Sequence, residues 1–173
     1  MSKYFLQLQT PTVELTVIGK DASGATVDIA AGIKRYEIDE AQEKFEQFNA
    51  INKELAAIEA DQANGIEVDK GYLKTLRNET AVKITEFLKE EIVYLKKVQL
   101  MEETSPGNYG KGPFIPDTRT FKDDSLWKDG HTSCLDFLLD MLLASAVWRG
   151  QIVSAVFSAF ANTKLGKEAE AKN

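Results

Sequence analysis

Residues 135–160 read LDFLLDMLLASAVWRGQIVSAVFSAF and form the most apolar stretch of an otherwise charged chain of 173 residues. Trp148, Arg149 and Gly150 interrupt this stretch near its middle. On both sides of the interruption the apolar residues recur at helical spacing, which predicts two amphipathic helices joined at Trp148-Arg149-Gly150. An apolar surface of this size is a core element, a membrane segment or a docking face for a partner.

A membrane role is disfavoured by the charges within the stretch. A membrane-spanning helix needs about 20 mainly apolar residues. Here Arg149 lies near the centre, and Asp136 and Asp140 lie upstream of it. An arginine at the bilayer midplane costs at least about 2.5 kcal/mol on insertion scales, and the two acids add to that cost. We therefore expect no membrane partner.

The overall charge disfavours nucleic acid as a partner. The chain has 27 acidic and 21 basic residues and a formal net charge of −6, which repels phosphate backbones unless basic residues cluster. The densest basic group is only the pair Lys96 and Lys97. A single cysteine, Cys134, cannot close an internal disulfide. The N-terminal residues alternate apolar and polar types, unlike a secretion signal, so a cytoplasmic location is expected.

The periodicity of the first two thirds predicts an α+β fold. Residues 1–38 contain runs of period-two alternation at 4–9, 13–18 and 25–30, with a short extended piece at 33–37, and these predict a small antiparallel sheet or meander. Helical spacing then runs through residues 39–103. Asp39 is the expected N-cap, Asn64-Gly65 the expected end of a first helix, and Thr80 an expected restart within the second. The sheet is therefore followed by a mainly α-helical body.

The last third divides into three segments within what we expect to be one domain. Residues 104–124 contain four glycines or asparagines and three prolines, so they predict a long loop. Residues 125–162 hold the C-terminal helical pair. Residues 163–173 are small and charged, and we expect this tail to fray.

The chain shows no pattern of a catalytic, cofactor or metal site. His131 is the only histidine, and it stands close to Cys134 in the segment DGHTSCLD. A zinc site needs about four ligands, and there is no second Cys or His pair. Thr132 or Ser133 is better explained as the N-cap of the apolar helix. We therefore predict a protein that is not an enzyme, with no catalytic residues, no cofactor and no metal.

Protein binding is the remaining class of function. Tryptophan and arginine most often anchor interfaces, and both occur in the C-terminal apolar segment. The same residues also suit a core in which two helices pack against the sheet, and the sequence leaves both readings open. The candidate partner-binding residues are Trp127, Leu138, Leu142, Trp148, Arg149, Ile152, Val156 and Phe160.

The C-terminal layout also resembles a known family. In SLWKDGHTSCLDFLLDMLLASAVWRGQIVSAVFSAFAN, a tryptophan precedes a leucine helix that bears aspartates, then WR, then a helix with small and aromatic residues. This third of the chain resembles the tail assembly chaperones of long-tailed bacteriophages. The resemblance implies a non-catalytic protein of the host cytoplasm that binds the tape measure protein and assists assembly of the tail tube. Residues 104–124 have no counterpart in that family's pattern.

Two other classes of protein fit the same residues. A structural virion component, such as a tail completion or capsid-associated protein, would use the apolar helices in a permanent interface. A small acidic inhibitor or regulatory protein would use its negative charge against a basic surface. Self-association into a homo-oligomer is compatible with each class.

Overall fold

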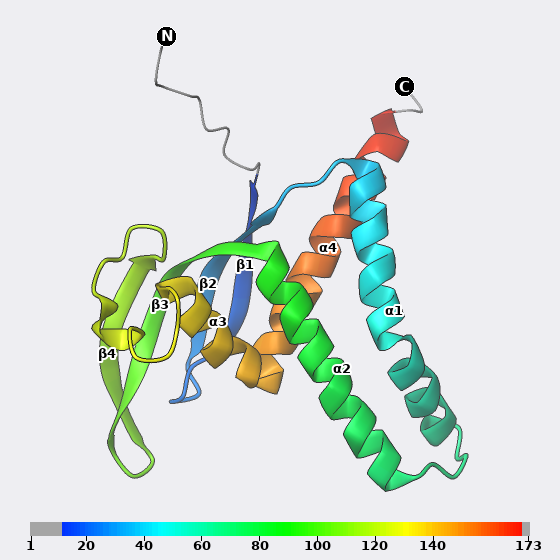
Figure 1. Cartoon of the computed structure of the whole chain (residues 1–173), viewed down its shortest axis with the longest axis horizontal. Coiled ribbons are helices and arrows are strands. Elements are labelled where there is room, and N and C mark those ends of the chain that lie inside the picture. The colour runs from blue at the N-terminus through cyan, green and yellow to red at the C-terminus, as the bar shows by residue number, and fades with distance from the viewer. Residues whose placement is uncertain (1–11, 171–173) are drawn as a thin grey trace.

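The α+β class is confirmed by the computed structural model, which describes residues 12–170 and the side chains of residues 12–162 (Figure 1). The predicted strand at residues 4–9 lies outside the described residues. The elements in chain order are β1 (Thr12–Lys20), β2 (Thr26–Lys34), α1 (Ile38–Ala63), α2 (Lys70–Glu91), β3 (Ile92–Ser105), β4 (Asn108–Asp117), the short 3-10 helix η1 (Asp124–Leu126), α3 (Cys134–Ala144) and α4 (Ala146–Glu170).

The first two strands form the hairpin that the sequence predicts. β1 and β2 pair antiparallel over their full length, from Thr12 opposite Lys34 to Lys20 opposite Thr26. The turn between them is held by Asp21, whose carboxylate accepts hydrogen bonds from the backbone N–H groups of Ser23 and Ala25. These bonds span only residues 21–25, DASGA, so the turn could be recognised from neighbouring residues alone.

The predicted helical region at residues 39–103 is wrong in its last part. α2 ends at Glu91, and Ile92 turns into the extended conformation (φ −84°, ψ 122°) that opens β3. β3 pairs with residues 30–33 of β2, which lie about 60 positions earlier in the chain. Since Ile92, Leu95 and Val98 also fit helical spacing, only this long-range pairing decides that they form a strand.

Two details of the helical hairpin also differ from expectation. The N-cap of α1 is Glu37, which forms a capping box with Glu40, and not Asp39. No break occurs at Thr80, because α2 runs unbroken through it and the side chain is buried. The first helix does end at Asn64, as predicted.

The predicted loop at residues 104–124 is also wrong in its first part. Residues 108–117 form β4, the edge strand of a four-stranded antiparallel sheet with the order β1-β2-β3-β4. Proline is tolerated in an edge strand because one side of that strand needs no backbone donors. Neither Pro113 nor Pro116 is a cross-strand partner of β3, whereas Phe114 and Ile115 between them are.

The two C-terminal helices meet at a sharper and earlier corner than predicted. The bend is 108° and falls at Ser145, which is extended (φ −76°, ψ 120°), so Trp148, Arg149 and Gly150 belong to the start of α4. Arg149 stabilises the corner because its guanidinium Nη1 donates to the carbonyl of Leu143, 2.6 Å away, at the end of α3.

Helix α4 reaches into the tail at residues 163–173, which we predict to fray. α4 continues to Glu170, and residues 171–173 lie outside the described part. Alanine, leucine, lysine and glutamate dominate the segment and are strong helix formers.

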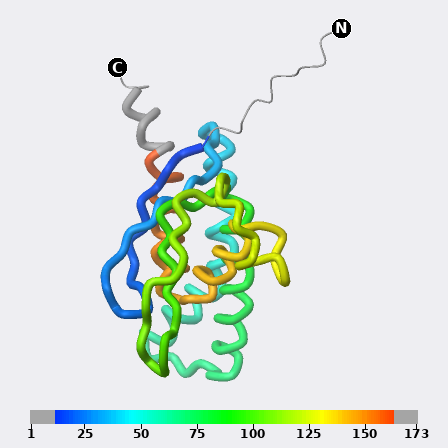
Figure 2. Tube along the Cα trace, turned by 90° about the vertical axis from the view of Figure 1, so that its left-hand side faces the viewer, coloured from blue at the N-terminus to red at the C-terminus, as the bar shows by residue number. Residues whose placement is uncertain are grey.

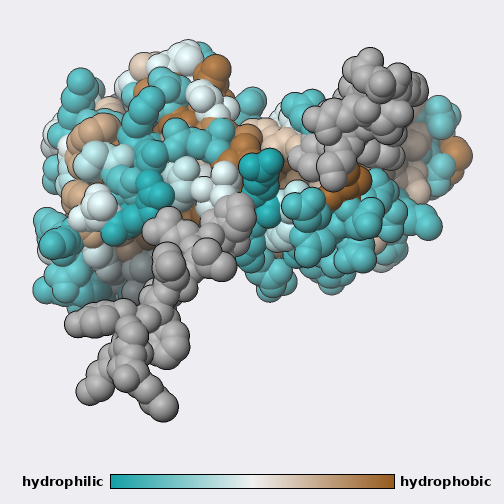
Figure 3. All heavy atoms as spheres, turned by 90° about the horizontal axis from the view of Figure 1, so that it is seen from above, coloured by the Kyte–Doolittle hydropathy of each residue, from teal (hydrophilic) through white to brown (hydrophobic). Residues whose placement is uncertain are grey.

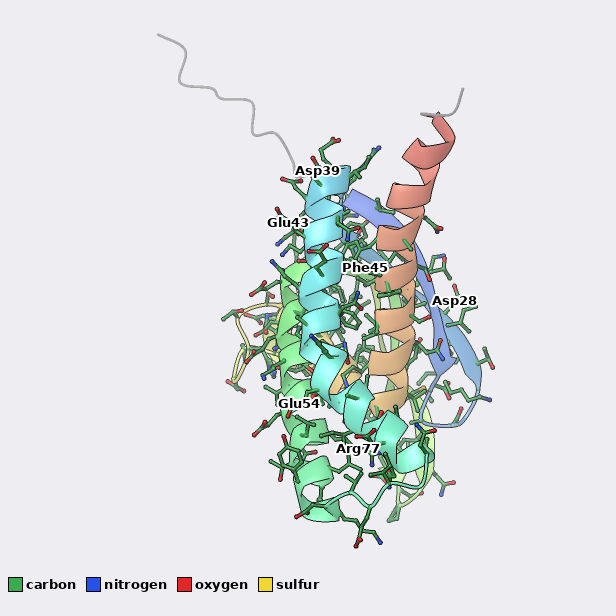
Figure 4. The ribbon with its side chains drawn as sticks, turned by 90° about the vertical axis from the view of Figure 1, so that its right-hand side faces the viewer. Asp28, Asp39, Glu43, Phe45, Glu54 and Arg77 are labelled. Atoms are coloured by element: carbon green, nitrogen blue, oxygen red, sulfur yellow. The ribbon has the colours of Figure 1, made fainter. Side chains whose placement is uncertain are left out.

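The core lies between the sheet and the helices α2, α3 and α4. Alternate residues of the strands, such as Val17, Ile29 and Leu95, face buried residues of the helices, such as Leu138 and Ile152. α1 lies outside this core and covers α2 and α4, as Figure 4 shows. Figure 2 shows the two strand hairpins side by side, and Figure 3 shows a mainly hydrophilic surface with small apolar areas.

Aromatic rings attach α1 to the rest of the molecule. Phe45 of α1 points toward α4 (Figure 4), where its ring centroid lies 4.6 Å from that of Phe157. The ring centroid of Phe48 lies 5.6 Å from that of Phe87 of α2. Only Ala41 of α1 is fully buried, so these rings supply much of the contact that keeps the helix in place.

A buried carboxylate lies at the junction of α2 and β3. Glu91 is fully buried and accepts a hydrogen bond of 2.7 Å from the hydroxyl of Tyr36. Its other oxygen is 2.9 Å from the ammonium group of Lys44 on α1. Burial, and then the hydrogen bond with Glu91, raise the pKa of Tyr36 above its usual value. The phenol therefore keeps its proton, and donates it to this bond, at all physiological pH values.

Candidate functional site

The sheet opens into a fork. β2 and β3 pair only where residues 30–33 of β2 meet residues 92–96 of β3. Immediately after this pairing, Lys97 adopts a positive φ of 60°, which is unusual for a residue other than glycine. From there β3 runs away from β2 as the partner of β4 alone, so the two hairpins separate (Figures 1 and 2).

The space within the fork is an open groove of about 440 Å³. This volume falls within the range of pockets that bind small molecules. We call it the fork groove. It is lined by residues 20–22 of the first turn, 26–29 of β2, 97–101 of β3, and Leu138, Met141, Leu142 and Trp148 of the two C-terminal helices.

Both walls of the fork groove are strand edges. Four consecutive residues of β2 and five of β3 line it, so residues that point to both faces of the sheet take part. Within the described residues, 26–29 pair only with β1, and β3 beyond Lys97 pairs only with β4. Each wall therefore presents backbone N–H and C=O groups of an unpaired edge.

The floor of the fork groove is apolar and is supplied by the C-terminal helices. Leu138 is nearly fully buried and Leu142 half-buried, while Met141 is 49% exposed. The half-buried indole of Trp148 closes the floor beside β1, where its Nε1 donates a hydrogen bond of 3.0 Å to the carbonyl of Lys20. This bond ties the indole ring to the end of β1 on this side of the floor.

The structure separates the eight predicted partner-binding residues into two groups. Leu138, Leu142 and Trp148 come together in the fork groove. The others lie elsewhere: Ile152, Val156 and Phe160 are buried in the core, Arg149 holds the helix corner, and Trp127 packs against Phe121.

Sequence reasoning missed most of the walls of the fork groove. The helical spacing predicted for residues 39–103 includes Val98, Leu100 and Met101, so it gave no indication that they line the groove opposite β2. Met141 could have been predicted from the sequence as a binding residue. It stands among four leucines, and a second apolar stripe on α3 would include it. The divergence at Lys97 has no sequence signal, since lysine is not a residue that favours a positive φ.

The cluster around His131 serves as a helix cap. The hydroxyl of Ser133 accepts the N–H of Asp136, as the capping prediction required, and Asp136 in turn accepts the N–H of Thr132. His131 Nε2 lies 3.0 Å from a carboxylate oxygen of Asp140. Cys134 is buried, and burial raises the pKa of its thiol, which keeps the thiolate needed of a nucleophile scarce.

A second polar cluster lies on the outer face of the sheet. The ring of Tyr94 covers Gly32, and the guanidinium of Arg119 lies 3.8 Å from the centre of that ring. Arg119 is paired with Asp117, and Lys96 with Glu14. Each charge in the cluster has a partner within it, and the cluster ties the four strands together.

No group of three or more His, Cys, Asp or Glu side chains is placed to hold a metal ion between residues 12 and 162. No single described helix is long and apolar enough to cross a membrane, and α3 and α4 reach that length only together, across their 108° bend.

Comparisons with family models, with curated proteins and with solved structures found nothing that matches this chain.

Proposed function

We propose that this protein is a non-catalytic assembly chaperone of a phage tail, and that the fork groove receives an apolar segment of the tape measure protein. The resemblance of residues 125–162 to tail assembly chaperones supplies the class of protein. The observation that carries the proposal is the fork groove, because it exposes apolar side chains from the same segment.

The make-up of the groove suits reversible binding of a polypeptide. Apolar floor residues give affinity without a strict sequence requirement, and methionine adapts its shape to different side chains. The strand edges on both walls offer backbone hydrogen bonds to any extended chain. A client held by modest contacts of this kind can be released when tail tube subunits, whose assembly the chaperone assists, take its place.

Affinity capture from cells that assemble the particle tests the proposal. The wild-type chain should retain the tape measure protein, identified by mass spectrometry, and finished particles should lack the chain. Met141→Lys places a charge in the groove, and capture should fall at least tenfold, which corresponds to about 1.4 kcal/mol.

Ile18→Lys is the matched control. Ile18 is 57% exposed on β1 but is not among the residues that line the groove, so its substitution should leave capture unchanged. Equal loss from both variants would contradict the groove as the binding site. Recovery of the chain in finished particles would instead favour the structural virion component, and the absence of any large helical partner would end the chaperone proposal.

A further inference from the structure

We propose that the fork groove accepts residues 4–9 of a second copy of this chain as an added β-strand. This inference concerns self-association and does not require the tape measure protein as a client. Both occupants would use the same groove, so each would exclude the other.

The first argument is the shape of the acceptor. β2 and β3 are neighbours in the sheet yet are paired over only a few residues, and beyond Lys97 both edges border one groove. A strand placed there gains hydrogen bonds from two edges at once, antiparallel to one wall and parallel to the other. Unpaired edges are otherwise a hazard that proteins cover.

The second argument is the chemistry of the donor segment. Residues 4–9 read YFLQLQ, in which Tyr4, Leu6 and Leu8 alternate with Phe5, Gln7 and Gln9. As a strand, this segment has one apolar face for the floor of Leu138, Leu142 and Trp148, and a second face that bears both glutamines. It carries no charge, so its insertion buries no unpaired ion.

The walls of the groove match an uncharged donor. The charged residues on the lining are Lys20, Asp21, Asp28 and Lys97, two of each sign, and all belong to the strands and the turn. Among them, Lys20, Asp28 and Lys97 are exposed, which keeps their charged groups in water at the rim. The floor contributed by the helices is wholly apolar.

The third argument is reach, which excludes the chain's own segment as the occupant. Thr12 pairs with Lys34, at the end of the sheet opposite the fork. The position in the groove nearest to Thr12 is level with Ile29. It lies about 17 Å from Thr12 along the strands and about 10 Å across them, which is about 20 Å in a straight line. Gln9 is three residues before Thr12 and reaches at most about 11 Å. A strand of residues 4–9 in the groove therefore comes from another molecule.

The geometry of exchange predicts the kind of assembly. The donor segment and the acceptor groove are different surfaces, so each single donation is a heterologous contact. Two copies that exchange segments reciprocally form a closed dimer, while one-way donation forms a ring or an open chain of copies.

Paired cysteine substitutions test the exchange in the full chain. One tagged copy carries Leu6→Cys, and a second, differently tagged copy carries Met101→Cys in the groove wall; the native Cys134 is buried. Under mild oxidation the mixture should give a disulfide-linked heterodimer. Val82→Cys on α2, which is 57% exposed and outside the groove, should give less than a tenth of that yield.

Measurement of mass in solution provides an independent readout. The wild-type chain should show species of two or more times 19.2 kDa that dissociate on dilution. Leu6→Glu charges the floor-facing side of the donor and should leave monomers. Gln7→Glu adds the same charge on the other side and should retain the assemblies. A monomeric wild-type chain, or equal cross-linking to Met101→Cys and Val82→Cys, would overturn the inference without bearing on capture of the tape measure protein.

Discussion

The indole ring of Trp148 lies directly on the backbone of Gly19, and a β-carbon at that glycine would be 2.6 Å from the ring. The first turn of α4 is thereby seated on β1, at the edge of the fork groove. No other residue type leaves room for the ring, so this glycine helps define both the helix position and the groove floor.

Substitution of Gly19 should destabilise the fold through this contact. Gly19→Ala forces the indole to move, and overpacking of this kind costs about 1–3 kcal/mol. In a chain of this length each 1 kcal/mol lowers the melting temperature by about 2–4 °C, which thermal denaturation would detect. Gly150→Ala is the control, because nothing lies within 4 Å of its added β-carbon. That change, within α4, should stabilise the protein by about 0.5–1 kcal/mol.

Substitution of Trp148 should separate its two roles. Trp148→Phe removes the hydrogen bond to Lys20 and keeps most of the ring, so the free energy of unfolding should fall by about 0.5–1.5 kcal/mol. Trp148→Ala also removes the ring from a half-buried site and should cost about 3 kcal/mol. Denaturant titration measures both values. If Trp148 served only a partner, both variants would unfold at the wild-type denaturant concentration.

The buried pair of Glu91 and Lys44 should behave as a coupled unit. Lys44→Met leaves the carboxylate of Glu91 buried without its cation, and the expected loss is about 3 kcal/mol. Addition of Glu91→Gln removes the uncompensated charge and should restore at least half of that loss. A double-mutant cycle on unfolding free energies gives the coupling. The exposed Lys53→Met provides the control for loss of a lysine on α1, and additive effects of the two substitutions would contradict the coupling.

The cap of α3 should contribute stability that depends on pH. The N–H of Thr132, then the ammonium of Lys89 and the nearby His131, lower the pKa of Asp136 below its usual value of 3.8. A group with a lowered folded-state pKa stabilises the fold above its unfolded pKa and loses that contribution as pH falls through the folded value. The contribution is therefore present above about pH 4 and lost in more acidic solution. Lys89 also pairs with Asp140, which keeps the cation in place.

Comparison of Asp136→Asn with the wild-type chain measures this contribution. The pair with Lys89 is partly exposed, so the difference in unfolding free energy at pH 7 should be below about 1 kcal/mol. The difference should shrink as the pH falls below 4. Asp129→Asn, at an exposed position before the cap, should show no such trend. A constant difference from pH 7 to pH 2 would show that the carboxylate's charge is not responsible.

Local residues sufficed to predict the elements whose stabilising bonds lie close in the sequence. The hairpin of β1 and β2 closes through Asp21 and its neighbours, and α3 begins with the Ser133 cap. The two apolar helices were likewise predictable, because helical spacing is a local pattern. The α+β class followed from the change of period after residue 38.

Tertiary structure alone decided the second half of the sheet and, with it, the fork groove. Residues 92–103 fit a helix by period, and they form a strand because β2 offers backbone partners about 60 positions away. β4 keeps its prolines because it lies at the sheet edge. The corner at Ser145 brings Leu138, Leu142 and Trp148 to one floor and takes Ile152, Val156 and Phe160 into the core. The sequence determined that this segment is apolar and helical; which of its side chains stay accessible depended on long-range packing, which no local pattern records.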